Sequence, residues 1–598
     1  MSRLRAVVGL FVGLSGACAA TTAAGPAAPA VDVPARDRST DDIENLVAFA
    51  RLYGYVRFFH PTDASRDADW AQLAIAGVQQ VRDAPTLGDL SDDLQRLFEP
   101  LAPSLQLWVE GQPIPAPQPV PSRRDGLVYW QYQGFPGTPV SLHTPPYSVV
   151  RVDPEKRWRR RFSASPAPDT RVQTFLAPQL QARLPVVLGT AQTQPPPGGL
   201  GQSVPSTTDP HDHRSLAVRQ AAVIEVWNVL RHFYPYQHEL ELDWEAMLIA
   251  ALRDAEDDQS LRDVRNTLRG LLEPLHDGHG YVGHRGYSRQ HTVPVRIELI
   301  EGKPVVTGTR DPEKFQVGDI VERIDGEPAL PRIHAIAERL SGTPQWREFR
   351  AAAWEALAVA PEQRRTLQLE RNGERHTVFA DAEREEIPAP PRPSMLHTFE
   401  DGVVYVDLTR AKWSDIEPHL PTLAEAPGVV FDLRGYPSDN DNILDHLLRE
   451  PEDALWMHVP RFVEPNGRVV GWHDLGWHRR PRTPHIAAPV SFLISADAIS
   501  YGESMLSYVE AHHLGTLVGT TTAGANGDIV RFDTVAGFYV IYSGMRVTRH
   551  DGSPFHRGGV APNVEIHRTV EGLRQGNDEV LEAGLDVVRR GQRPPNHS

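Results

Sequence analysis

Cysteine and lysine are scarce in this chain of 598 residues, and each shortage narrows the chemistry that the chain can support. Cys18 is the single cysteine, so the protein that follows an N-terminal signal has no internal disulfide. Four of the 61 basic residues are lysines, and none of them follows Lys412. The formal net charge of -16 argues against nucleic acid as a partner, because nucleic acid selects basic surfaces.

Long apolar runs are also absent, apart from one short run near the N-terminus. Two arginines precede the apolar segment Ala6–Leu14 and small residues follow it, a pattern typical of an export signal over residues 1–19. The segment is too short to span a membrane. Cys18 leaves two interpretations open, because it suits either lipid attachment, which would anchor the protein to a membrane, or simple cleavage. Both predict an extracytoplasmic protein, periplasmic or secreted, with residues 20–39 as a flexible tether.

Two stretches of the sequence resemble each other and predict a duplicated helical module. "RFFHPTDASRDADW" begins at residue 57, and "RHFYPYQHELELDW" begins at residue 231. The offset between them stays constant down to "LFEPL" at residue 97 and "LLEPL" at residue 271. Apolar residues recur in both at helical spacing, which predicts one small helical module over 40–104 and a second over 216–285. The copies diverge after this shared Pro-Leu, so that His279 of the second copy aligns with Leu105 of the first.

The remaining segments differ in composition, and the changes mark candidate domains. Alternating patterns such as "GLVYWQYQG" predict a β-rich domain, and short strands surround "VGDIVERIDG". Strands then alternate with helices, which favours an α/β domain with a largely parallel sheet. The predicted boundaries are 105–195 for the β-rich domain, 196–215 for a linker, 286–384 for the domain of short strands, 385–394 for a second linker, 395–572 for the α/β domain and 573–598 for a C-terminal helix and tail.

The stretch "PVSFLISADAISYGESMLSYVEAHH" places Ser500 between a strand-like run and a helix-like pattern. Glu503 follows three positions later, so the plain interpretation is a capping box that satisfies the first amides of the helix. The alternative is a nucleophile at the carboxyl end of a sheet strand, where α/β domains place ligands. A helix N-terminus offers free amides and a positive dipole end, which can stabilise an oxyanion, but a serine also needs a base to activate it.

Several ordered motifs resemble the serine peptidases related to C-terminal processing peptidases and the tricorn core protease, over about residues 216–570. "LHDGHGYV" resembles the segment with the catalytic histidine, "VGDIVERIDG" a PDZ domain and "VVFDLRGYP" the strand end beside the oxyanion hole. "SYGE" resembles the nucleophile turn, and "YSGMRVT" and "HRGGVAPNVEI" resemble closing segments. The resemblance implies a multidomain α/β and α+β protein. Its parts are a ClpP/crotonase-like α/β catalytic domain, a PDZ-like domain over 286–384, the duplicated helical modules and the N-terminal β-domain.

The resemblance also implies a catalytic layout. The family pairs its serine either with a downstream lysine, at the position of residue 525 here, or with a histidine and a distant glutamate. Position 525 is alanine and no lysine follows Ser500, so the implied pair is Ser500 and His279. His556 occupies the position of the family's glutamate, and it can orient a partner but cannot supply a negative charge. Glu503 is the other candidate for the third member, if its side chain turns inward.

Four further residues are candidates for the implied site. Asp277 either orients the imidazole of His279 or caps a turn. The amide of Tyr501, with one from the Gly435–Tyr436 turn, is the candidate oxyanion hole. His279 would take the serine proton during attack on a carbonyl and then protonate the leaving amine.

The resemblance therefore predicts an exported serine peptidase that acts on peptides or unfolded protein through an acyl-enzyme, without a cofactor. The histidines of "HDGHGYVGH" also raise the question of a metal site. Their spacing is weak evidence for one, and no metal is predicted. Two other functions stay open. One is a catalytically impaired binding or scaffold protein with a peptidase fold, and the other is an esterase or lactam hydrolase that uses the same residues.

Overall fold

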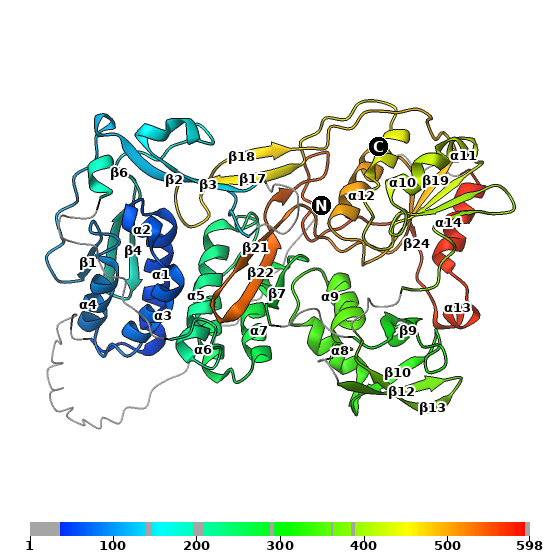
Figure 1. Ribbon diagram of the computed structural model, residues 1–598, viewed down its shortest axis with the longest axis horizontal. Helices are drawn as coiled ribbons and strands as arrows, with labels where there is room; N and C mark the ends of the chain where they lie inside the picture. Colours follow the sequence, from blue (N-terminus) through cyan, green and yellow to red (C-terminus); the bar gives the residue numbers. More distant parts are fainter. Residues whose placement is uncertain are drawn as a thin grey trace, which may run out of the picture.

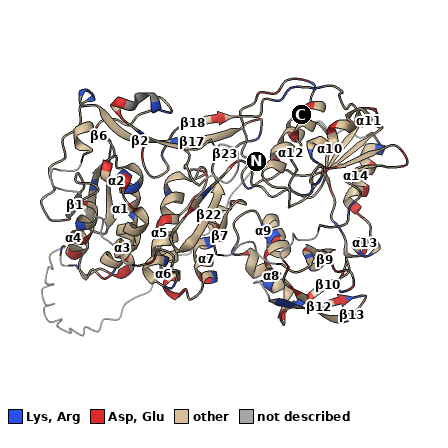
Figure 2. Ribbon diagram, viewed as in Figure 1, with Lys and Arg blue, Asp and Glu red and all other residues tan. Residues whose placement is uncertain are grey.

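The computed structural model describes residue 36 and residues 38–138, 146–194, 208–286, 292–359, 363–383 and 389–591. The predicted export signal with Cys18, most of the tether and most of the linker 196–215 lie outside the described residues. Among the residues that are described, no helix is both long and apolar enough to cross a membrane. Acidic and basic residues are interspersed along the described chain (Figure 2).

Two sets of helices repeat along the chain with a constant offset. In the first set, α1 is Asp42–Phe59, α3 is Trp70–Val81 and α4 is Leu87–Phe98. In the second set, α5 is Leu216–Phe233, α6 is Trp244–Asp257 and α7 is Leu261–Gly270. The offset between the first residues of matching helices is the same for all three pairs, and it equals the offset between the sequence motifs. Only the short helix α2, Asp63–Asp67, has no counterpart among the described helices.

The two sets pack against each other through equivalent positions of α1 and α5 (Figure 1). Phe59 and Phe233, the last residues of these two helices, stack with their ring centroids 5.9 Å apart. Asn228 donates hydrogen bonds from Nδ2 to the carbonyls of Ala50 and Ile224, at 3.0 and 2.9 Å. These two acceptors also occupy equivalent positions of the two copies, so the interface has an approximate twofold relation between them.

Each set of helices is followed by a three-stranded antiparallel sheet. The first sheet joins β1 (Gln106–Val109) to the hairpin of β4 (Arg171–Ala177) and β5 (Leu180–Pro185). The second sheet joins β7 (Tyr281–His284) to the hairpin of β21 (Ile529–Asp533) and β22 (Phe538–Ser543). In both sheets the first strand pairs with the second strand of the hairpin. The second hairpin comes from a distant part of the chain, so the pairing of β7 with β22 joins the helical module to the C-terminal segment.

The β-rich segment 105–195 does not form one closed unit. Its strands β2 (Leu127–Gln133) and β3 (Ser148–Val152) belong to a different sheet from β1, β4 and β5. That sheet continues into β17 (Met457–Phe462) and β18 (Val469–Leu475), which come from the predicted α/β domain. Pairing with β17 covers an edge of β2 whose backbone groups would otherwise lack partners, and it joins the N-terminal third to the C-terminal third.

The middle segment has its own sheet and its own hydrophobic core. The strand order is β13-β12-β10-β9-β8, with α8 (Ala329–Ala337) and α9 (Pro344–Arg350) packed beside it. The strands are β8 (Val295–Ile300), β9 (Lys303–Thr309), β10 (Ile320–Ile324), β12 (Arg364–Arg371) and β13 (Glu374–Asp381), and the short β11 (Glu327–Pro328) pairs with β10.

The C-terminal segment contains a six-stranded sheet in the order β14-β15-β16-β19-β20-β24. All neighbouring strands from β15 onward are parallel, and β14 is antiparallel. The strands are β14 (Leu396–Thr398), β15 (Val404–Asp407), β16 (Val429–Asp432), β19 (Val490–Ile494), β20 (Thr516–Gly519) and β24 (Val564–Glu565). Helix α12 (Tyr501–His512) follows β19, and α14 (Glu579–Arg589) packs on the sheet behind α13 (Val570–Gln575). The predicted mixed α/β multidomain architecture is confirmed.

Candidate active site

Ser500 occupies a strained position at the start of α12. Its φ of 57° and ψ of -113° are uncommon for a residue other than glycine, and such conformations concentrate at functional sites. The hydroxyl makes no capping hydrogen bond to the helix. It donates instead to the carbonyl of Gly527 over a long 3.5 Å, while the Ser500 amide donates to the carbonyl of Ala525 at 2.9 Å. The serine therefore begins the helix without using its side chain for the cap.

His279 is held from behind by Ser543 and Asp277. Its Nδ1 lies 2.8 Å from the hydroxyl of Ser543 and 3.9 Å from Oδ1 of Asp277. The Ser543 hydroxyl lies 2.8 Å from Asp277 Oδ1, and the Ser543 amide donates to Asp277 Oδ2 at 2.7 Å. Asp277 is fully buried and also accepts from the His279 amide at 3.0 Å. Ser543 ends β22, so the pairing of β22 with β7 brings it to the histidine.

These contacts assign the tautomer of His279. A hydroxyl has one proton, and an ionised carboxylate can only accept, so Ser543 donates to Asp277. The same oxygen then accepts from Nδ1–H of His279, which leaves the lone pair on Nε2. His279 Nε2 is buried and has no hydrogen-bond partner among the described residues. The ring is thus arranged with an unused basic nitrogen.

The surroundings of His279 favour its neutral form. Burial lowers the pKa of His279 below its ordinary value, and the charge of Asp277 opposes that shift. His556 adds a smaller effect that also lowers the pKa. A neutral imidazole at neutral pH is the form that can accept a proton from a hydroxyl.

Gly278 lets the turn with His279 approach the loop beside Ser500. A Cβ added at Gly278 would lie 2.7 Å from the Cβ of Ala525, the residue whose carbonyl accepts from the Ser500 amide. Trp346 of the middle segment donates from Nε1 to the carbonyl of Gly278 at 2.9 Å. Position 525 is where the lysine of the alternative layout would lie, and here it is filled by a small side chain against the turn.

His279 and Ser500 line the same cleft, whose volume is about 1530 Å³. The cleft is formed by segments that are far apart in the sequence. Its lining includes Thr138 and Tyr147 from the β2–β3 region, Ser414, Tyr436, Trp477 and Arg479 from the C-terminal segment, and Arg531 from β21. The wide, open shape suits an extended chain better than a small metabolite.

The structure does not bring Glu503 to His279. Its Oε1 accepts from the Gly524 amide at 2.7 Å and from the Thr522 hydroxyl, and its Oε2 accepts from the Ala525 amide at 2.8 Å. Burial raises the pKa of Glu503 to about 7, against the effect of these hydrogen bonds. The side chain points inward, as the sequence interpretation required, but it fastens the 522–525 loop and not the histidine.

His556 lies near the site without a hydrogen bond to His279. Its ring stacks on Tyr236 with centroids 4.0 Å apart, and its Nε2 lies 3.5 Å from the Tyr234 hydroxyl. Burial lowers the pKa of His556, while the charge of Asp277 raises it. Its place in the structure is that of a packed aromatic ring at the edge of the cluster.

The candidate oxyanion donors differ in availability. Tyr501 is the first residue of α12, so its N–H has no acceptor within the helix. The amide of Gly435 donates to the carbonyl of Leu433 at 3.0 Å, which occupies it. Tyr436 lines the cleft, and its ring lies 6.0 Å from that of Tyr501. Tyr501 and Tyr436 therefore remain candidate donors, and Gly435 serves the turn with its φ of 140°.

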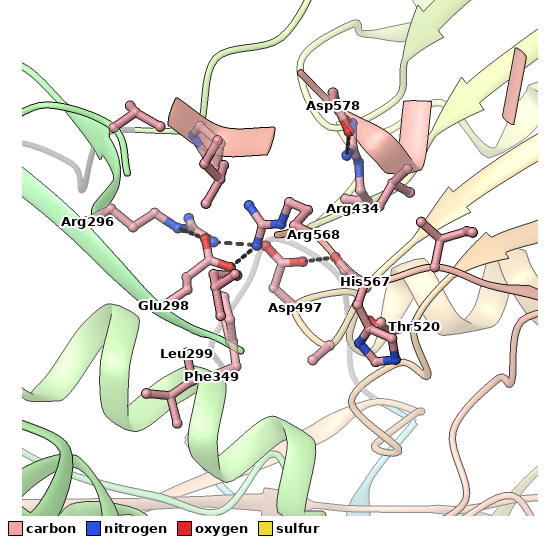
Figure 3. Close-up of a pocket in the computed structure, with 18 of the residues that line it drawn as sticks. Arg296, Glu298, Leu299, Phe349, Arg434, Asp497, Thr520, His567, Arg568 and Asp578 are labelled. Atoms are coloured by element: carbon pink, nitrogen blue, oxygen red, sulfur yellow. Dashed lines mark hydrogen bonds and ion pairs between the residues drawn. The ribbon is translucent and has the colours of Figure 1, made fainter. Parts of the chain in front are cut away.

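A second cavity, of about 310 Å³, lies where the middle segment meets the C-terminal sheet. Figure 3 shows Arg296 of β8 and Arg568 directed at Glu298. Arg296 also donates at 3.2 Å to Asp497, which shortly precedes Ser500. The middle segment is thereby tied by an ion pair to the loop that carries the serine.

Sequence reasoning missed Ser543 and Trp346. Ser543 stands in "YSGMRVT", whose resemblance to a closing segment does not indicate that it supplies a side chain to the site. Trp346 gave no signal, because a tryptophan near a helix start is most simply a core residue.

Comparisons with known proteins identify the C-terminal segment. Residues 402–566 match the model of peptidase family S41. Mature CPAF complexed with lactacystin superposes with a TM-score of 0.50 at 13% identity, over 62% of this chain and 97% of that one. A CPAF mutant gives 0.51 at 12%, over 62% and 98%. The photosystem II D1 C-terminal processing protease gives 0.38 at 15%, over 62% and 97%. At these identities the CPAF structures show a shared fold. No curated protein matches the sequence.

Proposed function

The chain belongs to the serine-type peptidases of family S41 through residues 402–566, and from this premise we propose that it is an exported peptidase with Ser500 as nucleophile and His279 as general base. One observation carries the proposal. A serine in a strained turn and a histidine with a free, buried Nε2 line one large cleft, although they come from segments far apart in the sequence.

Attack requires a small movement of the serine side chain. The hydroxyl of Ser500 now donates to the carbonyl of Gly527 over 3.5 Å, a weak contact that is easily exchanged. Rotation toward His279 Nε2 lets the imidazole accept the proton as Oγ bonds to the substrate carbonyl carbon. The carbonyl oxygen then becomes an oxyanion, for which the amides of Tyr501 and Tyr436 are the proposed donors. The protonated His279 gives its proton to the leaving amine, and water hydrolyses the acyl-enzyme.

Asp277 is the proposed source of negative charge behind the histidine, with Ser543 between the two. During the reaction Nδ1–H keeps donating to Ser543, whose hydroxyl keeps donating to Asp277. The imidazolium that forms is stabilised by the buried carboxylate 3.9 Å from Nδ1. This arrangement replaces the family's glutamate, whose position is filled by His556.

Peptides or unfolded protein segments are the proposed substrates. The size of the cleft and its mixed lining of aromatic and charged residues support a polymer chain that passes through it. The middle segment is proposed to be PDZ-like, because its sheet ends at β8 and β13, and a free edge can accept a peptide as an added strand. The ClpP/crotonase-like character of the C-terminal sheet is likewise proposed from the resemblance.

Export is proposed from the signal at residues 1–19, with Cys18 either lipidated or removed. The intact mass of protein from the native host distinguishes the two, because a diacylglyceryl or triacyl group on Cys18 raises the mass above that of the bare polypeptide. A cytoplasmic, uncleaved chain would contradict the proposal.

Labelling with a fluorophosphonate probe tests the catalytic assignment. We expect stoichiometric capture on Ser500 between pH 6 and 9, lost in Ser500→Ala and strongly reduced in His279→Ala. Ser414→Ala is the matched control, because Ser414 lines the same cleft and is exposed. Labelling that persists in Ser500→Ala, or no labelling of the folded wild type, contradicts the assignment. Absence of labelling in the folded wild type favours a binding protein, in which the Ser500 hydroxyl stays hydrogen-bonded to the carbonyl of Gly527.

A further inference from the structure

A cluster of two histidines and a glutamate lies outside the cleft, at the far end of α12. His512 is in the last turn of the helix, Glu452 precedes β17, and His550 follows the short β23 (Arg546–Val547). Each residue offers one ligand atom, and these atoms all lie within 4.8 Å of one another. Glu452 is 5% exposed and the side chain of His550 is largely buried, whereas His512 is exposed. The cluster plays no part in the proposed reaction.

The neighbours of His550 assign its tautomer. Ser507 donates its one hydroxyl proton to the carbonyl of Ser504 at 2.7 Å. His550 Nε2 lies 3.4 Å from the same Ser507 oxygen, so Nε2 carries the hydrogen and donates it. The lone pair is then on Nδ1. A ring nitrogen whose partner nitrogen donates to a neighbouring group is the usual arrangement of a metal-binding histidine.

The lone pair of His550 faces the carboxylate of Glu452. Nδ1 lies 3.3 Å from Glu452 Oε1, an ion-pair distance without a well-directed hydrogen bond. Glu452 Oε1 accepts from the Ala454 amide at 2.9 Å, and its buried Oε2 has no hydrogen-bond partner among the described residues. A lone pair against an anion is repulsive, and buried polar atoms without partners are destabilising. A cation between the two groups would remove both penalties.

We propose that Glu452, His512 and His550 bind a divalent transition-metal ion of the Zn²⁺ class. Two imidazoles and one carboxylate form a known type of three-residue zinc set, with the fourth position open to water. In a tetrahedral site with bonds of about 2.0–2.2 Å, ligand atoms lie about 3.3–3.6 Å apart, which the 3.3 Å between His550 and Glu452 already meets. The exposed His512 completes the set by a change of side-chain rotamer.

The alternative cation is a proton on His550, which the experiment below distinguishes from a metal ion. Burial lowers the pKa of His550, with Glu452 opposing that shift and the charge of His512 adding to it. Burial also lowers the pKa of His512. Neutral imidazoles at neutral pH are the forms that metals bind.

A bound ion would join three segments around the helix that begins at Ser500. From His550, aromatic contacts run to Tyr508 at 4.5 Å, from Tyr508 to Trp477 at 5.5 Å, and from Trp477 to Tyr501 at 5.7 Å. Trp477 and Tyr501 line the cleft. The ion would therefore stiffen the wall of the cleft from outside, whether or not the peptidase mechanism proposed above is correct.

Zinc titration of the full-length protein after chelator treatment tests the proposal. We expect one Zn²⁺ per chain with micromolar or tighter affinity at pH 7.5, and a higher melting temperature with Zn²⁺. His512→Ala should weaken binding by about 100-fold or more, since it removes a ligand whereas even the loss of a supporting partner costs about 10–100-fold. His512 is exposed, so this variant should fold. His567→Ala is the control, because His567 is an exposed histidine 3.0 Å from a single glutamate.

Trp456 provides a second, local readout. Its ring stacks on His550 with centroids 5.5 Å apart, so Ni²⁺ or Cu²⁺ in the site should quench its fluorescence. We expect the quench to disappear in Trp456→Phe and in His512→Ala. Binding below one ion per chain, or equal affinity in wild type, His512→Ala and Glu452→Gln, would overturn the proposal and leave a protonated His550 as the cation.

Discussion

In the first copy of the helical module, the chain leaves α4 and enters β1 through the buried, apolar Leu105, which is 4% exposed. In the second copy, the chain leaves α7 through a turn that contains Asp277 and His279 before it enters β7. The matching helices of the two copies begin at the same offset, and α3 and α6 are both capped by an aspartate. The difference shows that the same helical module tolerates either an apolar residue or a polar turn where the chain passes from its last helix to the following strand. Only the second copy has the polar turn.

The sheets explain why the second copy could hold that cluster. The first sheet is completed by the hairpin β4–β5, which belongs to the same third of the chain. The second sheet is completed by β21–β22, which belongs to the C-terminal segment and ends in Ser543. Strand pairing thus delivers a hydroxyl to His279 and joins the second copy to the loop of Ser500. The first copy stays a structural neighbour, whose β2–β3 region lines the outer cleft with Thr138 and Tyr147.

The largest effect is expected from making the second copy like the first. His279→Leu gives position 279 the residue found at 105, and it should lower kcat/KM by about 10³-fold or more, because no base would remain for Ser500. Peptide hydrolysis and fluorophosphonate labelling measure the loss of activity. His279→Gln keeps a polar side chain without a basic nitrogen, so an equal loss in this variant shows that the missing base, and not the apolar leucine, is the cause. His276→Asn is the control: its backbone is left-handed with φ of 49°, which asparagine tolerates, and activity should stay within about twofold. Full activity in His279→Leu would remove the distinction between the copies.

The second effect tests what the β22 strand supplies. Ser543→Ala should lower kcat by about 10–100-fold with little change in KM, because His279 keeps its place but loses the link to Asp277. Ser543→Thr should restore most of the activity, since it keeps the hydroxyl. Steady-state kinetics on the two variants distinguish a role of the Ser543 hydroxyl in hydrogen bonding between His279 and Asp277 from a role in packing alone. Equal losses in alanine and threonine would mean that Ser543 acts by shape.

The pH profile tests the charge of Asp277. Burial lowers the pKa of His279, so kcat/KM of the wild type should be flat near neutral pH and fall only when the pH drops below the range in which an ordinary histidine gains a proton. Asp277 raises that pKa, so its removal in Asp277→Asn should move the acidic limb to still lower pH while it lowers the maximal rate. A limb that moves to higher pH, or does not move, would exclude Asp277 as the charge behind the histidine.

The sequence predicted the features of this comparison that depend on local signals. The constant offset between the two motifs located the helices, because helical spacing of apolar residues and capping side chains such as Asp69 and Asp243 act within one or two turns. It also placed Ser500 at a strand-to-helix turn and singled out His279 by its divergence from Leu105. These predictions required no knowledge of which strands pair.

The features that could not be predicted from the sequence are those that depend on pairing between strands far apart in the chain. The Ser543 hydroxyl reaches Asp277 from the far end of the chain, and the contact of β2 with β17 joins Gln133 to Arg461. Register between distant strands has no local signal. The sequence also did not reveal which groups Glu503 contacts. A glutamate three positions after a serine can either cap the helix or bind a neighbouring loop, and only the structure shows that the 522–525 loop lies beside it.

A smaller effect is expected where the two copies touch. Gly54 of α1 lies against α5, and a Cβ there would come within 1.8 Å of Asn228 Oδ1. Gly54→Ala should therefore destabilise the protein by about 1–3 kcal/mol through overpacking, and separate the copies slightly. Gly270→Ala is the control, since a Cβ at Gly270 has open space and should leave stability equal or slightly higher. Denaturant midpoints compare the two, and equal midpoints would contradict the tight interface.

The smallest effect asks whether the two copies are equally well formed. Asp69 caps α3 by accepting from the Gln72 amide at 3.1 Å, and Asp243 caps α6 by accepting from the Ala246 amide at 2.9 Å. Both side chains are exposed, so each alanine substitution should cost about 1 kcal/mol, and the two costs should agree. Thermal unfolding of the two variants gives the comparison. A clear loss in Asp243→Ala with none in Asp69→Ala would mean that the first copy unfolds later or separately, and that the alike helices do not share one cooperative core.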